Sequence, residues 1–420
     1  MSPDAYDYDI LIAGAGPAGC AAAHDLAQAG LRVLLLDKRT FPRPKACACG
    51  LTRKTLNALR YSVDSIVERV CHEIVLQNKP GAPSMTTASP SSWVGSHNER
   101  SRDVKVRTRS PIAAMAVRER FDAFCLQQTL NMGAELKKID SILALRELPT
   151  HIELDVSTAT GTETLTAPVL IGADGSNGQT RRLTTTGTAR EPAWYSRGFA
   201  LEACVPYAAL PAQLPGGDAA TNLVFDFAPL PGGYGWLFPK GDHINIGVGT
   251  FADGSDDELK KVTRQLLLDY AQQKLGVSLA TINAPITGQH LGMGGHTYIP
   301  RGRVLLTGDA AGLVDPLTGE GIHSAIVSGQ AAAAAVLETR NPRPKTQNPI
   351  LDPAAAYARH LRPLQETLAF SARAARAFYA TPARGMKAMR TPVLRSLILK
   401  TYADGLPHPR LITTLARIFT

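Results

Sequence analysis

Three glycines near the start of the chain, Gly14, Gly16 and Gly19, constrain its fold more than any other feature. They follow an apolar run at residues 8–13, typical of a buried parallel strand, and precede a small-residue segment at 20–29 that we expect to be helical. In this order the first glycine permits a tight turn, the second lets the backbone approach a pyrophosphate, and the third lets helix and strand pack closely. The spacing predicts a Rossmann-type βαβ unit that holds a dinucleotide.

An acidic residue completes this unit. Asp37 ends a second apolar run, residues 31–37, at the distance where a carboxylate accepts hydrogen bonds from a ribose diol. We expect the pyrophosphate at the helix N-terminus, near Pro17 and Ala18, and Lys38 in contact with the cofactor as well. The motif alone does not distinguish FAD from NAD.

A later segment, residues 303–329, indicates FAD. An apolar strand ends at Asp309, whose carboxylate we expect to bond a ribityl or ribose hydroxyl. The following helix is expected to begin near residue 320, with the backbone of Gly319, Gly321 and Ile322 facing the flavin pyrimidine edge. Its dipole would stabilise negative charge on the reduced ring.

Three motifs in this order resemble the glutathione-reductase-type flavoproteins, specifically the para-hydroxybenzoate-hydroxylase-like group. They are GAGPAG at 14–19, GADG at 172–175 and GDAA at 308–311. The middle motif departs from the pattern at Gly178, where the group has serine, so we expect Asp174 to brace a loop as much as to serve a function.

One arginine also matches a position of this group. The resemblance implies that Arg118, at the start of an expected helix at 118–132, contacts the FAD phosphate or ribityl region. The alternative is a solvated arginine at a helix start.

Further stretches resemble the geranylgeranyl reductase family. PRPKACACG at 42–50 is similar to the family's PR-x-K-x-C-G-G segment, PGGYGWLFPK at 231–240 matches P-x-x-Y-x-W-x-F-P, and GEGIHSAIVSG at 319–329 is typical of it. Known members hydrogenate isoprenoid double bonds. The resemblance implies hydride transfer from reduced FAD to an apolar substrate, with NAD(P)H or a small redox protein as the electron donor.

The aromatic stretch also has a physical interpretation. Alternate residues of a strand share a face, so Tyr234, Trp236 and Phe238 are expected to project side by side and to bind a flat or polyprenyl substrate. Aromatic residues on a strand are otherwise ordinary core.

The cysteine stretch carries a catalytic candidate. By resemblance Cys47 lies near the flavin, and Ala48, Cys49 and Gly50 contact the cofactor. Ala48 and Cys49 replace the glycines of the family, which puts a catalytic role of Cys47 in doubt. A buried cysteine that serves as a small core residue is at least as good an interpretation.

The length of 420 residues exceeds what one hydrophobic core usually serves, so we expect a mixed α/β fold of two interlocked lobes and a helical tail. We expect several short strands within 139–170, strands throughout 192–248, and a helix over 256–275. We assign the segments as an FAD-binding lobe at 1–68, 103–190 and 296–340, a sheet-rich substrate lobe at 69–102 and 191–295, and a helical C-terminal region at 341–420.

Composition and charge limit which ligands and partners we expect. The six cysteines and ten histidines show no metal-ligand spacing, and no aromatic-interleaved basic stripe indicates nucleic acid, despite a net charge of +9. No secretory signal is visible and no apolar run reaches the ~20 residues of a membrane span, so we expect a cytoplasmic protein. The basic tail, 384–420, is either a peripheral contact with the inner face of a membrane or, more readily, a packed helix with a solvated face.

Two other functions stay open. An FAD-dependent monooxygenase (hydroxylase) or halogenase would share the FAD motifs and use oxygen at the same flavin face; halogenases carry W-x-W-x-I-P where this chain has Y-x-W-x-F-P. A non-catalytic flavin-binding protein is the second alternative.

Overall fold

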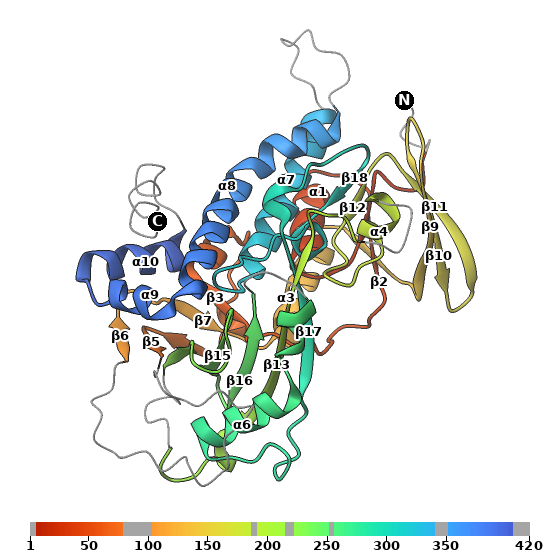
Figure 1. Cartoon of the computed structure of the whole chain (residues 1–420). Coiled ribbons are helices and arrows are strands. Elements are labelled where there is room, and N and C mark those ends of the chain that lie inside the picture. The colour runs from red at the N-terminus through yellow and green to blue at the C-terminus, as the bar shows by residue number, and fades with distance from the viewer. Residues whose placement is uncertain are drawn as a thin grey trace.

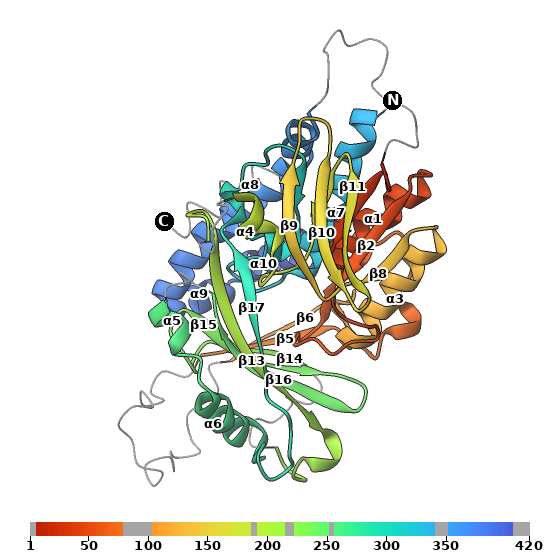
Figure 2. The ribbon, with the colours of Figure 1, turned by 90° about the vertical axis from the view of Figure 1, so that its right-hand side faces the viewer.

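The computed structural model describes residues 6–78, 103–185, 191–214, 222–251, 256–340 and 352–405. Its two largest sheets have five and seven strands (Figures 1 and 2). The polar stretch expected as a loop or sheet edge at 84–102 and the Pro/Asn-rich segment at 341–351 lie outside the described residues.

The glycine motif belongs to a five-stranded parallel sheet with the order β18-β12-β1-β2-β8. Its strands are β1 (Ile10–Ala13), β2 (Val33–Asp37), β8 (Glu135–Lys138), β12 (Leu170–Gly172) and β18 (Val304–Leu306). Every residue of β1 is buried, because helices or loops cover both faces of a central parallel strand. The two buried strands predicted at 8–13 and 31–37 are confirmed, each two residues shorter at its start.

Helix α1 (Pro17–Gln28) packs against β1 and β2 of this sheet. Helices α3 (Arg118–Asn131) and α7 (Ile322–Arg340) pack against α1, and α8 (Pro353–Ala380) lies along α7 (Figure 1). A Cβ on Gly329 of α7 would lie 2.2 Å from the carbonyl oxygen of Ala18 in α1, so the two helices meet backbone to backbone. This close packing explains the alanine-rich sequence of α7.

Two smaller sheets have three strands each. One is the antiparallel set β9 (Ser141–Glu147), β10 (Ile152–Thr158) and β11 (Gly161–Ala167), seen edge-on at the right of Figure 1. The other contains β3 (Gly50–Thr52), β4 (Arg69–Cys71) and β7 (Ala113–Met115). Two short helices, α2 (Arg53–Ala58) and α4 (Thr180–Thr185), follow β3 and β12 in the chain.

The seven-stranded sheet has the order β17-β13-β16-β15-β14-β5-β6. Its strands are β5 (Glu73–Gln77), β6 (Val104–Arg107), β13 (Ser196–Pro206), β14 (Leu223–Asp226), β15 (Gly233–Pro239), β16 (His243–Thr250) and β17 (Thr287–Met293). The segment at 103–190, which the sequence assigned wholly to the FAD-binding lobe, therefore begins with a strand of this sheet, since β6 pairs with the otherwise open edge of β5.

The helix predicted over 256–275 is two helices, α5 (Asp256–Lys260) and α6 (Arg264–Leu275). The break arises because the side chain of Thr263 accepts a hydrogen bond from the amide of Leu266 and so caps a new helix. Helix α6 covers one face of the seven-stranded sheet (Figure 2), and the opposite face lines the cavity described below.

The C-terminal region is helical, as predicted, in three pieces: α8 (Pro353–Ala380), α9 (Pro382–Met389) and α10 (Pro392–Asp404). Each begins with proline, whose missing N–H is not needed in the first turn. Among the described residues, none of the helices combines the length and apolarity that a membrane crossing requires.

Candidate active site

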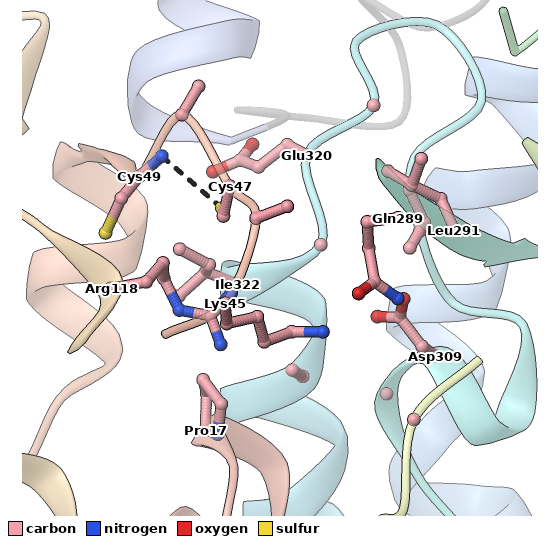
Figure 3. Close-up of a pocket in the computed structure, with 18 of the residues that line it drawn as sticks. Pro17, Lys45, Cys47, Cys49, Arg118, Gln289, Leu291, Asp309, Glu320 and Ile322 are labelled. Carbon is pink, nitrogen blue, oxygen red and sulfur yellow. Dashed lines mark hydrogen bonds between the residues drawn. The ribbon is translucent and has the colours of Figure 1, made fainter. Parts of the chain in front are cut away.

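A cavity of about 1450 Å³, its open mouth included, is lined from both large sheets (Figure 3). Its lining joins the glycine turn of the parallel sheet to the aromatic strand of the seven-stranded sheet. A dinucleotide bound at the turn would therefore reach toward the aromatic side chains.

The glycine turn forms one end of the cavity. Gly14 has φ +104°, and a Cβ there would lie 2.3 Å from the carbonyl oxygen of Ala173, while a Cβ on Gly19 would lie 1.9 Å from that of Gly14. A Cβ on Gly16 would instead meet its nearest atom, Nη2 of Arg43, at 3.7 Å. The turn and the helix packing thus need Gly14 and Gly19, as predicted, whereas the backbone at Gly16 faces open space.

This end of the cavity is suited to an anion. Gly16 caps α1 without a side-chain hydrogen bond, so the first amides of the helix are left to a ligand. Buried Asp122 pairs with both Arg43 (3.1 Å) and Arg118 (2.8 Å), which leaves one guanidinium charge unbalanced. Nε of Arg43 has no hydrogen-bond partner among the described residues. These features fit a pyrophosphate.

Arg118 is 6% exposed and lines the cavity, so the alternative of a solvated arginine is wrong. Its guanidinium forms two hydrogen bonds with Asp122, 2.8 and 2.9 Å long, because the pair lies one helical turn apart in α3.

Lys45 extends across the cavity toward Asp309 (Figure 3). Burial, and then the charge of Arg118, lower the pKa of Lys45. Burial raises the pKa of Asp309, and Lys45 partly offsets that effect. Asp309 accepts a hydrogen bond from the amide of Gly292 at 3.4 Å and lies in a 3₁₀ turn, Gly308–Ala311, which follows β18 where we had expected the strand to continue.

Asp37 reaches the cavity but also supports the turn. Its Oδ2 accepts a hydrogen bond from the amide of Ala15, and its Oδ1 from that of Arg39, both at 2.8 Å. Lys38 does not line the cavity: it is exposed, and its Nζ donates to Oε1 of Gln179 at 2.7 Å. The reason is that Asp37 and Lys38, as neighbours at a strand end, point to opposite sides.

Asp174 is a loop brace that also lines the cavity. Its carboxylate accepts hydrogen bonds from the amides of Gln179 (2.6 Å) and Thr180 (2.9 Å), so it caps α4. A Cβ on Gly178 would lie 2.1 Å from Oδ1 of Asp174. Serine at this position would therefore collide with the brace, which accounts for the departure from the related pattern.

A buried lysine holds the cysteine loop. Nζ of Lys240 donates to the carbonyl oxygens of Ala48, Cys49 (3.3 Å) and Ala116 (2.8 Å). Burial lowers the pKa of this ammonium. Cys47 lines the cavity and its Sγ accepts from the amide of Cys49 at 3.3 Å (Figure 3), while Cys49 itself is buried with φ +45°. The loop that replaces the family's glycines thus keeps a left-handed residue.

Tyr234, Trp236 and Phe238 share one face of β15 and line the cavity, as predicted. Each is at most 7% exposed and belongs to a hydrophobic cluster, so the core and pocket interpretations both apply. Nε1 of Trp236 donates to Oδ1 of Asn245 at 2.7 Å, and the hydroxyl of Tyr234 donates to the carbonyl oxygen of Thr318.

The start of α7 forms the far end of the cavity. Gly319, with φ +68°, Gly321 and Ile322 all line it, although the helix begins at Ile322, two residues later than expected. Glu320 accepts hydrogen bonds from the hydroxyls of Thr52 (2.8 Å) and Thr55 (3.1 Å).

Sequence reasoning missed four charged residues of the cavity: Arg43, Lys45, Glu202 and Glu320. The first two lie in the PR-x-K stretch, so a signal was present. Glu202 is a lone acidic residue in a strand, which has no pattern to reveal it.

The cavity, its glycine turn and the parallel sheet define the class of the protein: it is an FAD-dependent oxidoreductase. Residues 7–339 match the FAD binding domain family, which confirms the predicted cofactor.

Proteins of similar sequence indicate the family within this class. An uncharacterized protein of Methanosarcina barkeri is 32% identical over 78% of this chain and 74% of its own. Digeranylgeranylglycerophospholipid reductase 3 of Methanosphaera stadtmanae is 26% identical over 80% of this chain and 79% of its own. The chain belongs to the FAD binding domain family and, within it, to the geranylgeranyl reductase family.

Solved structures show the same fold. A geranylgeranyl bacteriochlorophyll reductase-like protein of Thermoplasma acidophilum has a TM-score of 0.70 and 19% identity, covering 98% of this chain and 99% of that one. A flavin-dependent brominase has a TM-score of 0.69 and 17% identity, covering 98% of both chains. Reductases and halogenases thus share this architecture, so the fold alone does not select the chemistry.

Proposed function

We propose that the protein reduces carbon–carbon double bonds of an isoprenoid or similar apolar substrate, to which reduced FAD, when bound, supplies the hydride. A second, apolar chamber of about 1150 Å³, its open mouth included, carries this proposal. It shares Phe225, Tyr234, Thr318 and Tyr402 with the first cavity, so the two adjoin at the aromatic face. The name of the Methanosphaera relative, a reductase of a polyprenyl lipid, supports the same substrate class.

The chamber is built to hold an apolar chain. Its walls come from β5, β6 and β14 on one side and from α8, α9 and α10 on the other, for example Leu76, Phe378 and Leu399. Among its polar groups, Lys54 pairs with Glu320 outside the chamber. Since its walls are mainly aliphatic and aromatic, the chamber favours apolar burial, which contributes about 25 cal/mol per Å².

The residues of the first cavity divide into groups by what they would hold. We propose that the backbone amides of Gly16 and Ala18, with Pro17 (which has no N–H) between them, hold the pyrophosphate together with Arg43, and that Asp37 binds a ribose.

The other proposed contacts run from the ribityl chain of the cofactor to its flavin ring. We propose that Asp309 holds the ribityl chain and that Gly319, Gly321 and Ile322 place the positive end of α7 beside the ring. Arg118 would act near the phosphate through its neighbour Arg43, with Ala48, Cys49 and Gly50 as the opposite wall.

The aromatic face, Tyr234, Trp236 and Phe238, would orient the double bond and exclude water. We propose Cys47 as a thiol beside the reacting atoms, since it lines the cavity next to this face. The parallel sheet would then be the FAD-binding lobe and the seven-stranded sheet the substrate lobe. NAD(P)H or a small redox protein would supply the electrons.

An anaerobic experiment tests the proposal. The purified protein is reduced with dithionite, and polyprenyl compounds or cell lipids are added without oxygen. Flavin reoxidation with a product two hydrogens heavier is expected. If reoxidation waits for air and the product gains oxygen or halogen, a monooxygenase or halogenase is correct instead; if no donor reduces the flavin and no substrate reoxidises it, the protein is a non-catalytic flavin binder.

Lipid substrates suggest where the chain would meet them. The chamber wall includes Met389 and Leu399 of α9 and α10, whose outer sides expose Arg384, Lys387 and Lys400. We propose that this basic side rests on anionic lipid. Co-sedimentation should be stronger with anionic than with neutral vesicles. Equal binding to both would mean that these helices are a packed pair with a solvated charged face and do not contact a membrane.

A further inference from the structure

The cavity-facing side of the seven-stranded sheet holds one carboxyl group within its aromatic face. Trp236 of β15, Gly247 of β16 and Glu202 of β13 form one cross-strand row. Because Gly247 has no side chain, the indole of Trp236 extends over it toward β13: a Cβ there would lie 2.0 Å from Cζ2 of Trp236. Glu202 therefore ends the row that begins with the central aromatic side chain.

Glu202 is 8% exposed and lines the cavity. Its Oε1 accepts a hydrogen bond from the amide of Cys47 at 2.7 Å, and the amide side chain of Asn245 also hydrogen-bonds the carboxyl. Asn245 in turn accepts from Trp236. The carboxyl is thus held between the cysteine loop and the aromatic face, with no ion-pair partner within 4 Å among the described residues.

The titratable groups around Glu202 come from its own strand and from three other elements. Lys240 at the end of β15 is bound to the carbonyl groups of the cysteine loop, Arg118 of α3 is bound to Asp122, and the thiols of Cys47 and Cys204 lie near it. Burial is the largest effect on the carboxyl and raises its pKa, which these cations and the two hydrogen bonds only partly offset. A proton is therefore retained to higher pH than on an exposed glutamate.

Other acids of the cavity are engaged elsewhere. Asp309, whose pKa burial also raises, accepts from the amide of Gly292 and is the residue proposed above to hold the ribityl chain. Glu320 is bound by two threonine hydroxyls and Lys54, and Asp174 caps α4. Asp37 supports the glycine turn, and the hydroxyl of Tyr234 is already donated to a carbonyl oxygen.

We propose that Glu202 is the acid that delivers the proton in the reduction of the double bond. The inference rests on the proposed function. One carbon of the double bond accepts a hydride from the reduced flavin, which is oxidised, and the other accepts the Glu202 proton as the π bond breaks. The electron pair of the O–H bond stays on the carboxylate, which regains its proton from solvent before the next turnover.

Glu202→Gln tests this role. The amide oxygen can still accept from the amide of Cys47, so the loop keeps its contact, but the acid is gone. We expect unchanged flavin content and reduction by dithionite, with anaerobic reoxidation by a polyprenyl alkene slowed by about 10²–10⁴-fold. In the wild type the rate should fall as pH rises through the pKa of the acid, and this limb should vanish in the variant.

Three comparisons make the result decisive. Cys204→Ser, on the same face of β13 but outside the cavity lining, should react like the wild type. Infrared difference spectra, in which deuterium exchange shifts the stretch of a protonated carboxyl, should show a band that Glu202→Gln lacks. A wild-type rate in Glu202→Gln, a Cys47→Ala variant that alone loses the pH limb, or absence of the band would overturn the acid role. A wild type that fails to react with any alkene overturns the proposed function itself.

Discussion

Replacing Gly247 with alanine would place a methyl group where the indole of Trp236 lies. The added Cβ would be 2.0 Å from Cζ2 and 2.5 Å from Cε2 and Cη2, whereas carbon atoms in contact prefer about 3.5–4.0 Å. The indole is 6% exposed and anchored to Asn245, so it has little room to move.

Overpacking of this kind costs about 1–3 kcal/mol, and loss of the Asn245 hydrogen bond adds about 1 kcal/mol. We therefore expect Gly247→Ala to lower the free energy of unfolding by about 2–4 kcal/mol. With ~2.1 cal/mol/K of unfolding entropy per residue over 420 residues, the melting temperature should fall by roughly 2–5 °C.

The assay is a double-mutant cycle followed by urea unfolding. Trp236→Phe removes the ring that the new methyl group would meet, so Gly247→Ala should cost much less in that background. Gly241→Ala is the control, because a Cβ there meets nothing closer than 3.6 Å, and it should stay within about 0.5 kcal/mol of the wild type. If Gly247→Ala costs the same, within about 0.5 kcal/mol, with and without the indole, our account of this face is wrong.

Three further predictions concern the cofactor and pH. Gly16→Val should fold, since the space at Gly16 is open, yet lose FAD, and Asp309→Ala should weaken FAD binding; heat-released flavin and melting curves check both, and full FAD in both variants would refute the site. Burial first, then Lys54, lower the pKa of His323 from 6.5 to about 4. The unfolded chain therefore takes up a proton below about pH 6.5 that the folded chain refuses until about pH 4, so stability falls with pH in that window by up to ~3 kcal/mol. His323→Gln should flatten this part of the urea-derived pH profile, and an unaltered slope would contradict it. Lys240→Met should remove the hydrogen-bond donor of three carbonyl groups, which lowers the free energy of unfolding by about 2 kcal/mol or more and lowers the flavin content. A wild-type urea midpoint would show that Lys240 does not stabilise the cysteine loop.

Local sequence determined the parts of the protein that depend on neighbouring residues. A strand, a glycine turn and a helix within residues 8–29 are specified by short-range sterics, so the dinucleotide end of the cavity could be predicted almost residue by residue. The same holds for the alternation that puts Tyr234, Trp236 and Phe238 on one face, since the period of a strand is two.

Local signals failed where a distant contact decides the outcome. The break before α6 is a local feature, because Thr263 caps the new helix. The place of β6 is not local: it joins the seven-stranded sheet because the edge of β5 is available, and no pattern within residues 103–107 indicates that. Lys38 follows Asp37 and seemed to belong with it, yet Gln179 lies nearby in space and binds it outside the cavity.

Only the tertiary structure brings together the groups that we propose for the reaction. Glu202 and Cys47 are 155 residues apart, and their hydrogen bond exists because the seven-stranded sheet packs against the loop after β2. Lys240 likewise reaches back to a loop 192 residues earlier. Sequence patterns indicate which side chains share a strand or a helix. The burial of a carboxyl group depends instead on what packs around it, and burial sets the pKa at which the group loses its proton. The cofactor could therefore be predicted from the sequence, whereas the acid proposed for the reaction could not.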